Sequence, residues 1–351
     1  MPVRPRPRAP EIMNNKIVRT ICLFRKNPTN SDVSRVNELA DKLSNSGYEV
    51  QTRRICSPNI DKILELDESN SDQNLIFGIG SLDSNAMNKN FEVLFDAKNI
   101  SLSFDLTDIK ITDETSKILF NLIRKDPSKT FDFAYVVNNP VSSPYFPSGT
   151  YGADGFSIGF QPTDLAEGCE SLDEWFKKMK NVWQEVSRVF EKESDFLGID
   201  SSVAPLFTGK SSLINFIKSL EISFEKSATT DVYIKITNFI KNNNPKPVGL
   251  CGLMLPCLED FELADEYEAD NFSIERNLFL SLQSGLGIDT YPVGIDQNID
   301  RVTEILKLVQ KLSLKHNKPL SVRLVSDGKA KIGEKTDFKN QYLKDVIVRE
   351  L

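Results

Sequence analysis

The sequence GLCGLMLPCLED at residues 249–260 is followed, after a helical pattern, by GLGIDTYPVGID at residues 285–296. Each apolar run ends in carboxylates, Glu259 and Asp260 in the first and Asp289 in the second. This pattern is typical of a buried strand whose carboxyl end opens onto a site, because in α/β proteins ligands bind at the carboxyl ends of strands. We therefore expect the three acids to form one wall of a pocket.

A covering helix is predicted between the two runs. Ile274, Leu278 and Leu282 recur at four-residue spacing, and glycines follow at Gly285 and Gly287, where a helix can end. The unit is predicted to be strand, helix, strand.

Composition excludes several classes of protein. The 351 residues are 40% hydrophobic and 26% charged, as in ordinary globular proteins, and the length suits one large domain or two smaller ones. A net charge of −7 gives no basic field for nucleic acid or an anionic membrane. The sequence contains no apolar run of about 18 residues and no signal-peptide core, so we expect a cytoplasmic protein without membrane or nucleic-acid partners.

Thiol, histidine and triad chemistry are disfavoured. The sequence has one histidine, His316, so neither a His-rich metal site nor a Ser/His/Asp triad is expected. An odd number of cysteines without CxxC spacing indicates buried free thiols: Cys22, Cys56, Cys169, Cys251 and Cys257.

Strand and helix patterns alternate from residue 16 onward. Residues 1–15 are rich in Pro and Arg and lack periodicity, so they are predicted to be a disordered tail. The remainder, residues 16–351, is predicted to be a single α/β domain with parallel strands and helical crossovers. At residues 138–155 three prolines and three glycines interrupt the pattern, and Tyr145 gives this loop aromatic surface. A loop of this length predicts a lid or pocket wall, with an ordinary surface excursion as the alternative.

The longest helical pattern, at residues 171–194, carries an aromatic stripe that indicates core or a subunit interface. The stripe consists of Trp175, Met179, Trp183, Val186 and Phe190. A homo-oligomer is expected if the stripe is an interface.

Further polar residues follow other predicted strands. FLGI ends at Asp200, with Ser201 and Ser202 after it, and this trio suits a polar ligand or a hard cation such as magnesium or calcium. A turn-capping cluster is the alternative. KPLSVRLV delivers Arg323, whose planar fork matches a carboxylate or phosphate. The TGKSS segment lacks the first glycine of a P-loop, so nucleotide binding is disfavoured.

Several of these motifs together resemble domain-of-unknown-function family 711. They are VRTICLF, GYEVQTRRI, PYFPSGTYGADGFSIGFQPTDL, LGIDSSVAPL, GLMLPCLED, GIDTYPVGID and KPLSVRLV. The resemblance spans residues 16–348 and implies a ten-stranded α/β barrel like that of pyruvate formate-lyase. From alternation alone, another βα-repeat barrel or a doubly wound sheet fits equally well. The resemblance implies no reaction, and Gly328 and Gly333 do not match a glycyl-radical loop, so radical chemistry is not expected.

The leading hypothesis is an enzyme acting on a small polar or anionic metabolite at an acidic site inside the barrel. Crowded acids raise one another's pKa, which suits general acid or base catalysis or binding of a divalent cation. By this reasoning Asp289→Asn would stabilise the unliganded protein. A non-catalytic metabolite or metal binding protein and a structural oligomer are the alternatives. The candidate catalytic residues are Asp200, Glu259, Asp260 and Asp289; the candidate ligand contacts are Arg54, Tyr145, Ser201, Ser202, Arg276 and Arg323; and the candidate metal ligands are Asp200, Glu259 and Asp289.

Overall fold

The computed structural model describes residues 16–70, 72, 74–92, 95, 97–147 and 149–351. The predicted tail at residues 1–15 lies outside these residues.

The described strands form one mixed sheet of nine strands, in the order β7-β6-β1-β2-β3-β4-β5-β9-β8. Neighbouring strands are parallel except at the β1–β6 and β5–β9 pairs, which are antiparallel. The predicted α/β class is confirmed. The strands are β1 (Ile17–Phe24), β2 (Glu49–Cys56), β3 (Leu75–Leu82), β4 (Ile100–Asp105), β5 (Phe133–Val137), β6 (Gly155–Phe160), β7 (Phe196–Asp200), β8 (Gly287–Pro292) and β9 (Leu320–Val325).

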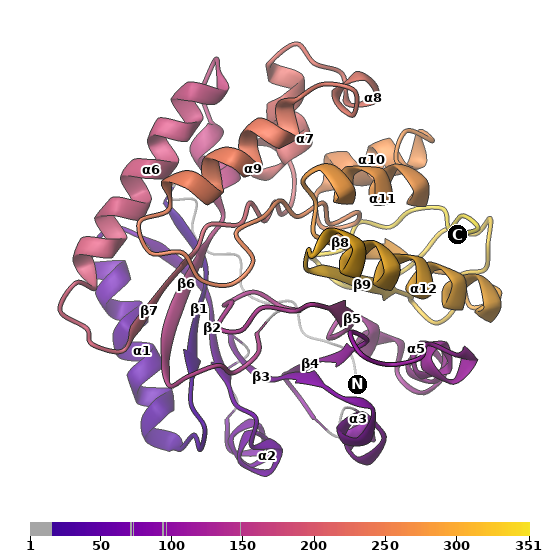
Figure 1. Cartoon of the computed structure of the whole chain (residues 1–351), viewed down its shortest axis with the longest axis horizontal. Helices are drawn as coiled ribbons and strands as arrows, with labels where there is room; N and C mark the ends of the chain where they lie inside the picture. The colour runs from indigo at the N-terminus through magenta and orange to yellow at the C-terminus, as the bar shows by residue number, and fades with distance from the viewer. Residues whose placement is uncertain (1–15, 71, 73, 93–94, 96, 148) are drawn as a thin grey trace.

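Helices surround the curved sheet on its outer side (Figure 1). None in the part of the chain that the structure describes has the length and apolar character needed to cross a membrane. The α-helices are α1 (Asn30–Asn45), α2 (Ile60–Ser69), α3 (Ser84–Asn90), α5 (Asp113–Lys125), α6 (Leu172–Val189), α7 (Leu213–Ser219), α8 (Phe224–Ser227), α9 (Val232–Asn243), α10 (Phe261–Glu268), α11 (Ile274–Gln283) and α12 (Ile299–His316). Short 3-10 turns lie at Pro127–Thr130, Pro162–Ala166 and Gly209–Ser211.

The aromatic stripe of α6 belongs to the core of this chain. Trp175 and Trp183 are fully buried, and their rings contact Phe216 at 4.9 Å and Phe239 at 5.7 Å between centroids. The stripe therefore packs between the sheet and the helices α7 and α9, and needs no second subunit to cover it.

Residues 247–260 do not form the strand that their apolar run predicts. Gly249 and Cys251 have φ angles of 73° and 43°, which break an extended conformation. The segment instead makes isolated parallel bridges to both edges of the sheet, Val203 to Leu253 on the β7 side and Pro256 to Asp289 on the β8 side. The irregular segment therefore lies between the two edge strands and connects them.

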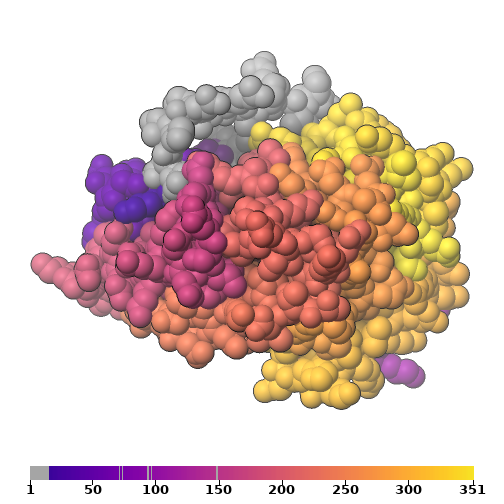
Figure 2. All heavy atoms as spheres, turned by 90° about the horizontal axis from the view of Figure 1, so that it is seen from above, coloured from indigo at the N-terminus to yellow at the C-terminus, as the bar shows by residue number. Residues whose placement is uncertain are grey.

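The C-terminal residues lie against the same region. Figure 2 shows them packed on the part of the surface that neighbours the chain around residues 250–300. Tyr342 is stacked between Phe131 and Phe207, with ring centroids 6.5 Å and 5.6 Å away. This contact joins the end of the chain to the approach to β5 and to the loop after β7.

Asp260 holds the ends of two helices together. Its Oδ1 accepts from the backbone N–H of Leu263 at the start of α10, at 3.4 Å. Its Oδ2 accepts from the N–H groups of Leu213 and Ile214 at the start of α7, at 3.0 and 3.5 Å. A carboxylate that satisfies otherwise unpaired N–H groups stabilises a helix start through hydrogen bonds and the helix dipole.

We expect Asp260→Ala to lower the free energy of unfolding by about 2 kcal/mol, because two helix starts lose their acceptor. Asp83→Ala is the matched control, since Asp83 is exposed and caps only α3, through the N–H of Ala86; its cost should be about 1 kcal/mol. Urea unfolding measures both. Equal costs would contradict a double cap.

Candidate functional site

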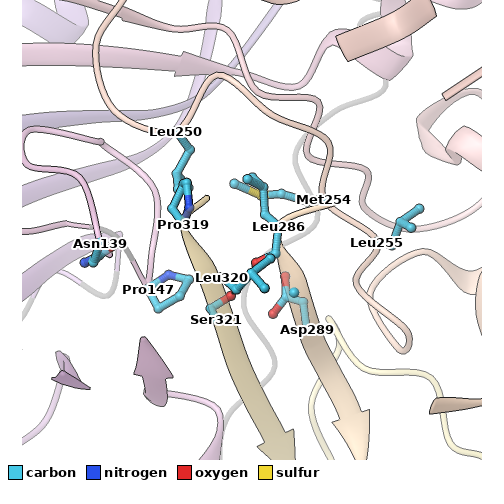
Figure 3. Close-up of a pocket in the computed structure, with 11 residues that line it drawn as sticks. Asn139, Pro147, Leu250, Met254, Leu255, Leu286, Asp289, Pro319, Leu320 and Ser321 are labelled. Atoms are coloured by element: carbon cyan, nitrogen blue, oxygen red, sulfur yellow. The ribbon is translucent and has the colours of Figure 1, made fainter. Parts of the chain in front are cut away.

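A pocket lies where the 138–155 loop, the 247–260 segment, β8 and the start of β9 meet (Figure 3). It spans about 390 Å³ including its open mouth. Most of the lining is apolar, and the polar side chains are few, as in small-molecule sites. The lining residues are Asn139, Pro147, Leu250, Met254, Leu255, Leu286, Gly287, Asp289, Pro319, Leu320 and Ser321.

Arg323 anchors the acidic part of this site. It lies on β9, and its Nε donates to Asp289 Oδ1 at 2.6 Å while its Nη2 donates to Glu259 Oε1 at 2.5 Å. Its guanidinium also faces the rings of Phe131 and Phe146, with centroid distances of 5.1 and 5.4 Å. Arg323 is only 6% exposed, so these contacts fix its position in a region of low dielectric.

The carboxylate of Asp289 is held at one oxygen. Among the described residues, Oδ1 is paired with Arg323 whereas Oδ2 has no hydrogen-bond partner. Figure 3 shows the side chain projecting from β8 among the lining residues. Asp289 thus presents a positioned acceptor to the pocket.

Local backbone features of β8 create this orientation. Gly287 lies so close to β9 that a Cβ atom there would meet the Ser321 carbonyl oxygen at 2.1 Å. Thr290 has a φ of 41°, and the register of β8 against β9 shifts between Ile288 and Tyr291. The irregularity turns Tyr291 toward Tyr267 at 5.3 Å between ring centroids, instead of keeping it on the face that Asp289 occupies.

Burial and charge act in opposite directions on this cluster. Burial raises the pKa of Glu259, and the positive charge of Arg323 opposes that rise. Burial also disfavours the Arg323 cation, but Asp289 and Glu259 together raise its pKa above the ordinary value. Arg19 on β1 adds a weaker contact to Glu259 Oε2 at 3.5 Å. Each ion of the cluster therefore depends on an opposite charge that remains in place.

Asp200, a predicted catalytic residue, is enclosed by hydrogen-bond donors. It is fully buried and accepts from Ser143 Oγ at 2.6 Å, and from the backbone N–H groups of Leu250 and Cys251 at 2.8 and 3.0 Å. Ser202 Oγ also donates to it, at 2.6 Å. The acid ties β7 to the loops on either side, so its acceptor capacity is already used.

Several other predicted site residues form hydrogen bonds outside the pocket. Asp260 caps helices, and burial raises its pKa to about 7. Ser201 donates to the Ile240 carbonyl at 3.0 Å, and the Tyr145 hydroxyl donates to the Phe160 carbonyl at 2.6 Å. Arg276 lies on the covering helix α11 and donates to the Asn271 carbonyl at 2.6 Å. These residues organise the scaffold and do not line the pocket.

The three predicted metal ligands do not form one group: Glu259 and Asp289 meet at Arg323, and Asp200 has other partners. No group of three or more His, Cys, Asp or Glu side chains suited to hold a metal occurs within residues that the structure describes. Asp200 is bound by Ser143 and backbone N–H groups, while Glu259 and Asp289 are neutralised by Arg323. The Arg323 guanidinium therefore supplies the positive charge that the sequence analysis expected from a metal ion.

The loop at 138–155 is a pocket wall inside the curve of the sheet. Three neighbouring strands hold it. Cys56 Sγ donates to the Gly149 carbonyl and Ser103 Oγ to the Pro147 carbonyl, both at 2.6 Å, and the side-chain hydroxyls of Ser81 and Thr150 are 2.9 Å apart. Pro147 lines the first pocket and also a second one.

The second pocket lies between this loop and strands β1 to β4. It spans about 250 Å³ including its mouth. Burial raises the pKa of the Cys22 thiol, and that of Cys56 to about 12, so both line it as neutral thiols. The lining residues are Cys22, Arg54, Cys56, Gly78, Gly80, Ser101, Leu102, Ser103, Phe146, Pro147 and Gly149.

Sequence reasoning missed Arg19 and Asn139. Arg19 stands as a single charge within the otherwise apolar run of β1, and this was the available signal for an inward-facing cation. Asn139 had no comparable signal, because polar residues are ordinary in a loop.

Comparison with known proteins identifies the family but no activity. None of the curated proteins matches the chain significantly. A solved structure described as "Anaerobic ribonucleotide reductase" aligns over 89% of this chain and 71% of that chain, with 8% identity and a TM-score of 0.33, which is too low to carry an inference. The family model described as "Uncharacterised ACR (DUF711)" matches residues 110–340. This match covers most of the chain, so the protein belongs to the DUF711 family that its sequence motifs resemble.

Proposed function

We propose that the protein is an enzyme that binds a small polar metabolite in the first pocket and uses Asp289 as its hydrogen-bond acceptor or general base. The observation that supports this proposal is the geometry of Asp289. One carboxylate oxygen is fixed by Arg323 at 2.6 Å, and the other has no partner among the described residues. A base that is already oriented needs no reorganisation when a ligand arrives.

The lining determines which ligands fit. Asp289 Oδ2 and Asn139 Oδ1 are acceptors without partners among the described residues. Arg323 pairs with the other oxygen of Asp289, and Asn139 donates to Ser81 and Thr150 through its Nδ2. Met254, Leu286 and Leu320 supply apolar surface. The complementary ligand carries a hydroxyl or amino group on a short apolar body.

The family resemblance favours a closed barrel around this site. The bridges of residues 247–260 to both edge strands support a ring in which this segment takes the place of a tenth strand. In such a barrel the loop at 138–155 lies in the interior, and its contacts with β2, β3 and β4 agree with that position.

One observation favours a second candidate, a binding protein without turnover. Among the described residues that line the first pocket, Asp289 is the only ionisable side chain. A reaction that needs both a general acid and a general base would have to take the second group from the ligand or from solvent.

The proposal predicts that four- to six-carbon diols or primary amines raise the melting temperature of the protein saturably. Asp289→Asn should weaken binding about tenfold or more, because the amide loses acceptor capacity. Asp296→Asn is the matched control, since Asp296 makes the same charge change at an exposed position outside the pocket.

Mass spectrometry of each bound compound after incubation separates the two candidates. Conversion that is lost in Asp289→Asn supports the enzyme, and recovery of the unchanged compound supports the binding protein. If no compound shifts the melting temperature, or if Asp289→Asn binds as wild type does, the pocket does not have the proposed role.

The ion cluster makes a separate prediction about stability. Asp289→Asn should destabilise the protein by about 1 kcal/mol instead of stabilising it, because it removes a partner of Arg323. Arg323→Met should cost about 3–5 kcal/mol, since it leaves Asp289 buried without a cation and Glu259 with only the weaker contact to Arg19. Denaturant unfolding at pH 5 and pH 8 measures both.

The cost of Arg323→Met should be smaller at pH 5 than at pH 8. Burial raises the pKa of Glu259, and removal of Arg323 takes away the charge that opposes the rise. The folded variant then binds a proton more tightly than the unfolded chain, so its stability falls as the pH rises through this window. A cost independent of pH would contradict this account.

A further inference from the structure

We propose that the second pocket is a binding site for a small carboxylate, with Arg54 as the cation that holds it. This proposal is independent of the role of Asp289, because the residues that line the two pockets share only Pro147.

Arg54 makes few contacts with the residues that the structure describes. Among the described residues it makes no ion pair, and its single hydrogen bond runs from Nη1 to Ser101 Oγ at the limiting distance of 3.5 Å. Its Nε is buried without any partner. Nε and Nη2 form the edge of the guanidinium that commonly binds a carboxylate through two parallel hydrogen bonds, and this edge is unused.

The other arginines nearby are paired. Arg53, its neighbour on β2, donates to Asn37 Oδ1 and Asp72 Oδ2, both at 2.6 Å. Arg19 donates to Gln51 at 3.1 Å and to Glu259, and Arg323 has both of its acids. These three arginines have acceptors within the chain, whereas the Nε–Nη2 edge of Arg54 has none among the described residues, which supports a ligand there.

The charges around Arg54 favour an added anion. Burial lowers its pKa first, and the positive charges of Arg19 and Arg323 lower it further, while Cys22 and Asp132 act in the opposite direction. Asp132 is the acid that acts on Arg54, and it forms neither an ion pair nor a hydrogen bond with it. A bound carboxylate would offset the cost of a half-buried cation that has no ion pair among the described residues.

The size and lining of the pocket restrict the anion. Two glycines of β3 leave little free space in the lining. A Cβ atom on Gly80 would meet the Thr150 Cα at 3.1 Å, and one on Gly78 would meet Cys56 Sγ at 3.4 Å. Ser103 already donates to the Pro147 carbonyl. The pocket therefore matches the planar three-atom carboxylate group on a short chain better than a nucleotide or diphosphate.

The test uses sodium acetate as the probe, with acetamide as the uncharged isostere and sodium chloride to keep ionic strength constant. We expect acetate, but not acetamide, to raise the melting temperature of the full chain saturably. Arg54→Met should weaken acetate binding by about tenfold or more. It should also raise the melting temperature without acetate, because the half-buried cation with its unpartnered Nε is gone.

Arg53→Met is the matched control, because it removes a paired arginine from the position that precedes Arg54 on the same strand. It should leave acetate binding unchanged. Asp289→Asn should also leave it unchanged, so failure here is distinct from failure of the first-pocket proposal. If Arg54→Met does not fold, Arg54→Gln repeats the test with a neutral side chain. Equal acetate shifts in wild type and the Arg54 variants, or no acetate shift in wild type, would overturn the proposal.

Discussion

The pairing of Arg323 with Glu259 and Asp289 is the interaction on which the interior depends. The three residues come from β9, from the irregular segment at 247–260 and from β8. Parallel strand pairing, with one register shift, joins β8 to β9, but the segment at 247–260 has only isolated bridges to its neighbours. The ion pairs supply a second connection at the point where backbone pairing is sparse. Because all three side chains are buried, each charge is tolerated only while its opposite charge stays in place.

Much of the fold could be predicted because its signals are local. β-branched strands and amphipathic helices alternate along the chain, and the sequence shows both periodicities directly. The segment at 247–260 was the exception. Its apolar run is as buried as a strand, yet positive φ angles at Gly249 and Cys251 direct it away from a regular ladder. Hydrophobicity indicates burial, and it does not by itself distinguish a strand from an irregular buried segment.

The candidate site was only partly predictable, because the role of a carboxylate depends on which groups approach it. Asp260 had a local signal, since it directly precedes the helical pattern FELADEYE and is thus a good N-cap. Asp200 had only a partial one: Ser202, two residues later, donates to it, but its donors Ser143 and Leu250 lie 57 and 50 residues away in sequence. Asp289 and Arg323 were identified from their places in strands, but their contact, across 34 residues, required the parallel pairing of β8 with β9.

Alternation along the strands explains why the interior contains so many cations. On β2, Arg53 turns outward to Asn37 of α1, and Arg54 therefore turns to the opposite face, which the 138–155 loop covers. The register of β1 with β2 places Cys22 beside Arg54. An inward arginine on a central strand is partly withdrawn from solvent, so acceptors within the protein stabilise its charge. Glu259 and Asp289 balance Arg323 at one end, and the 138–155 loop offers no acid to Arg54 within its described residues. The loop thus divides the interior into a part whose charges are paired within the chain and a part in which one cation is left without a partner.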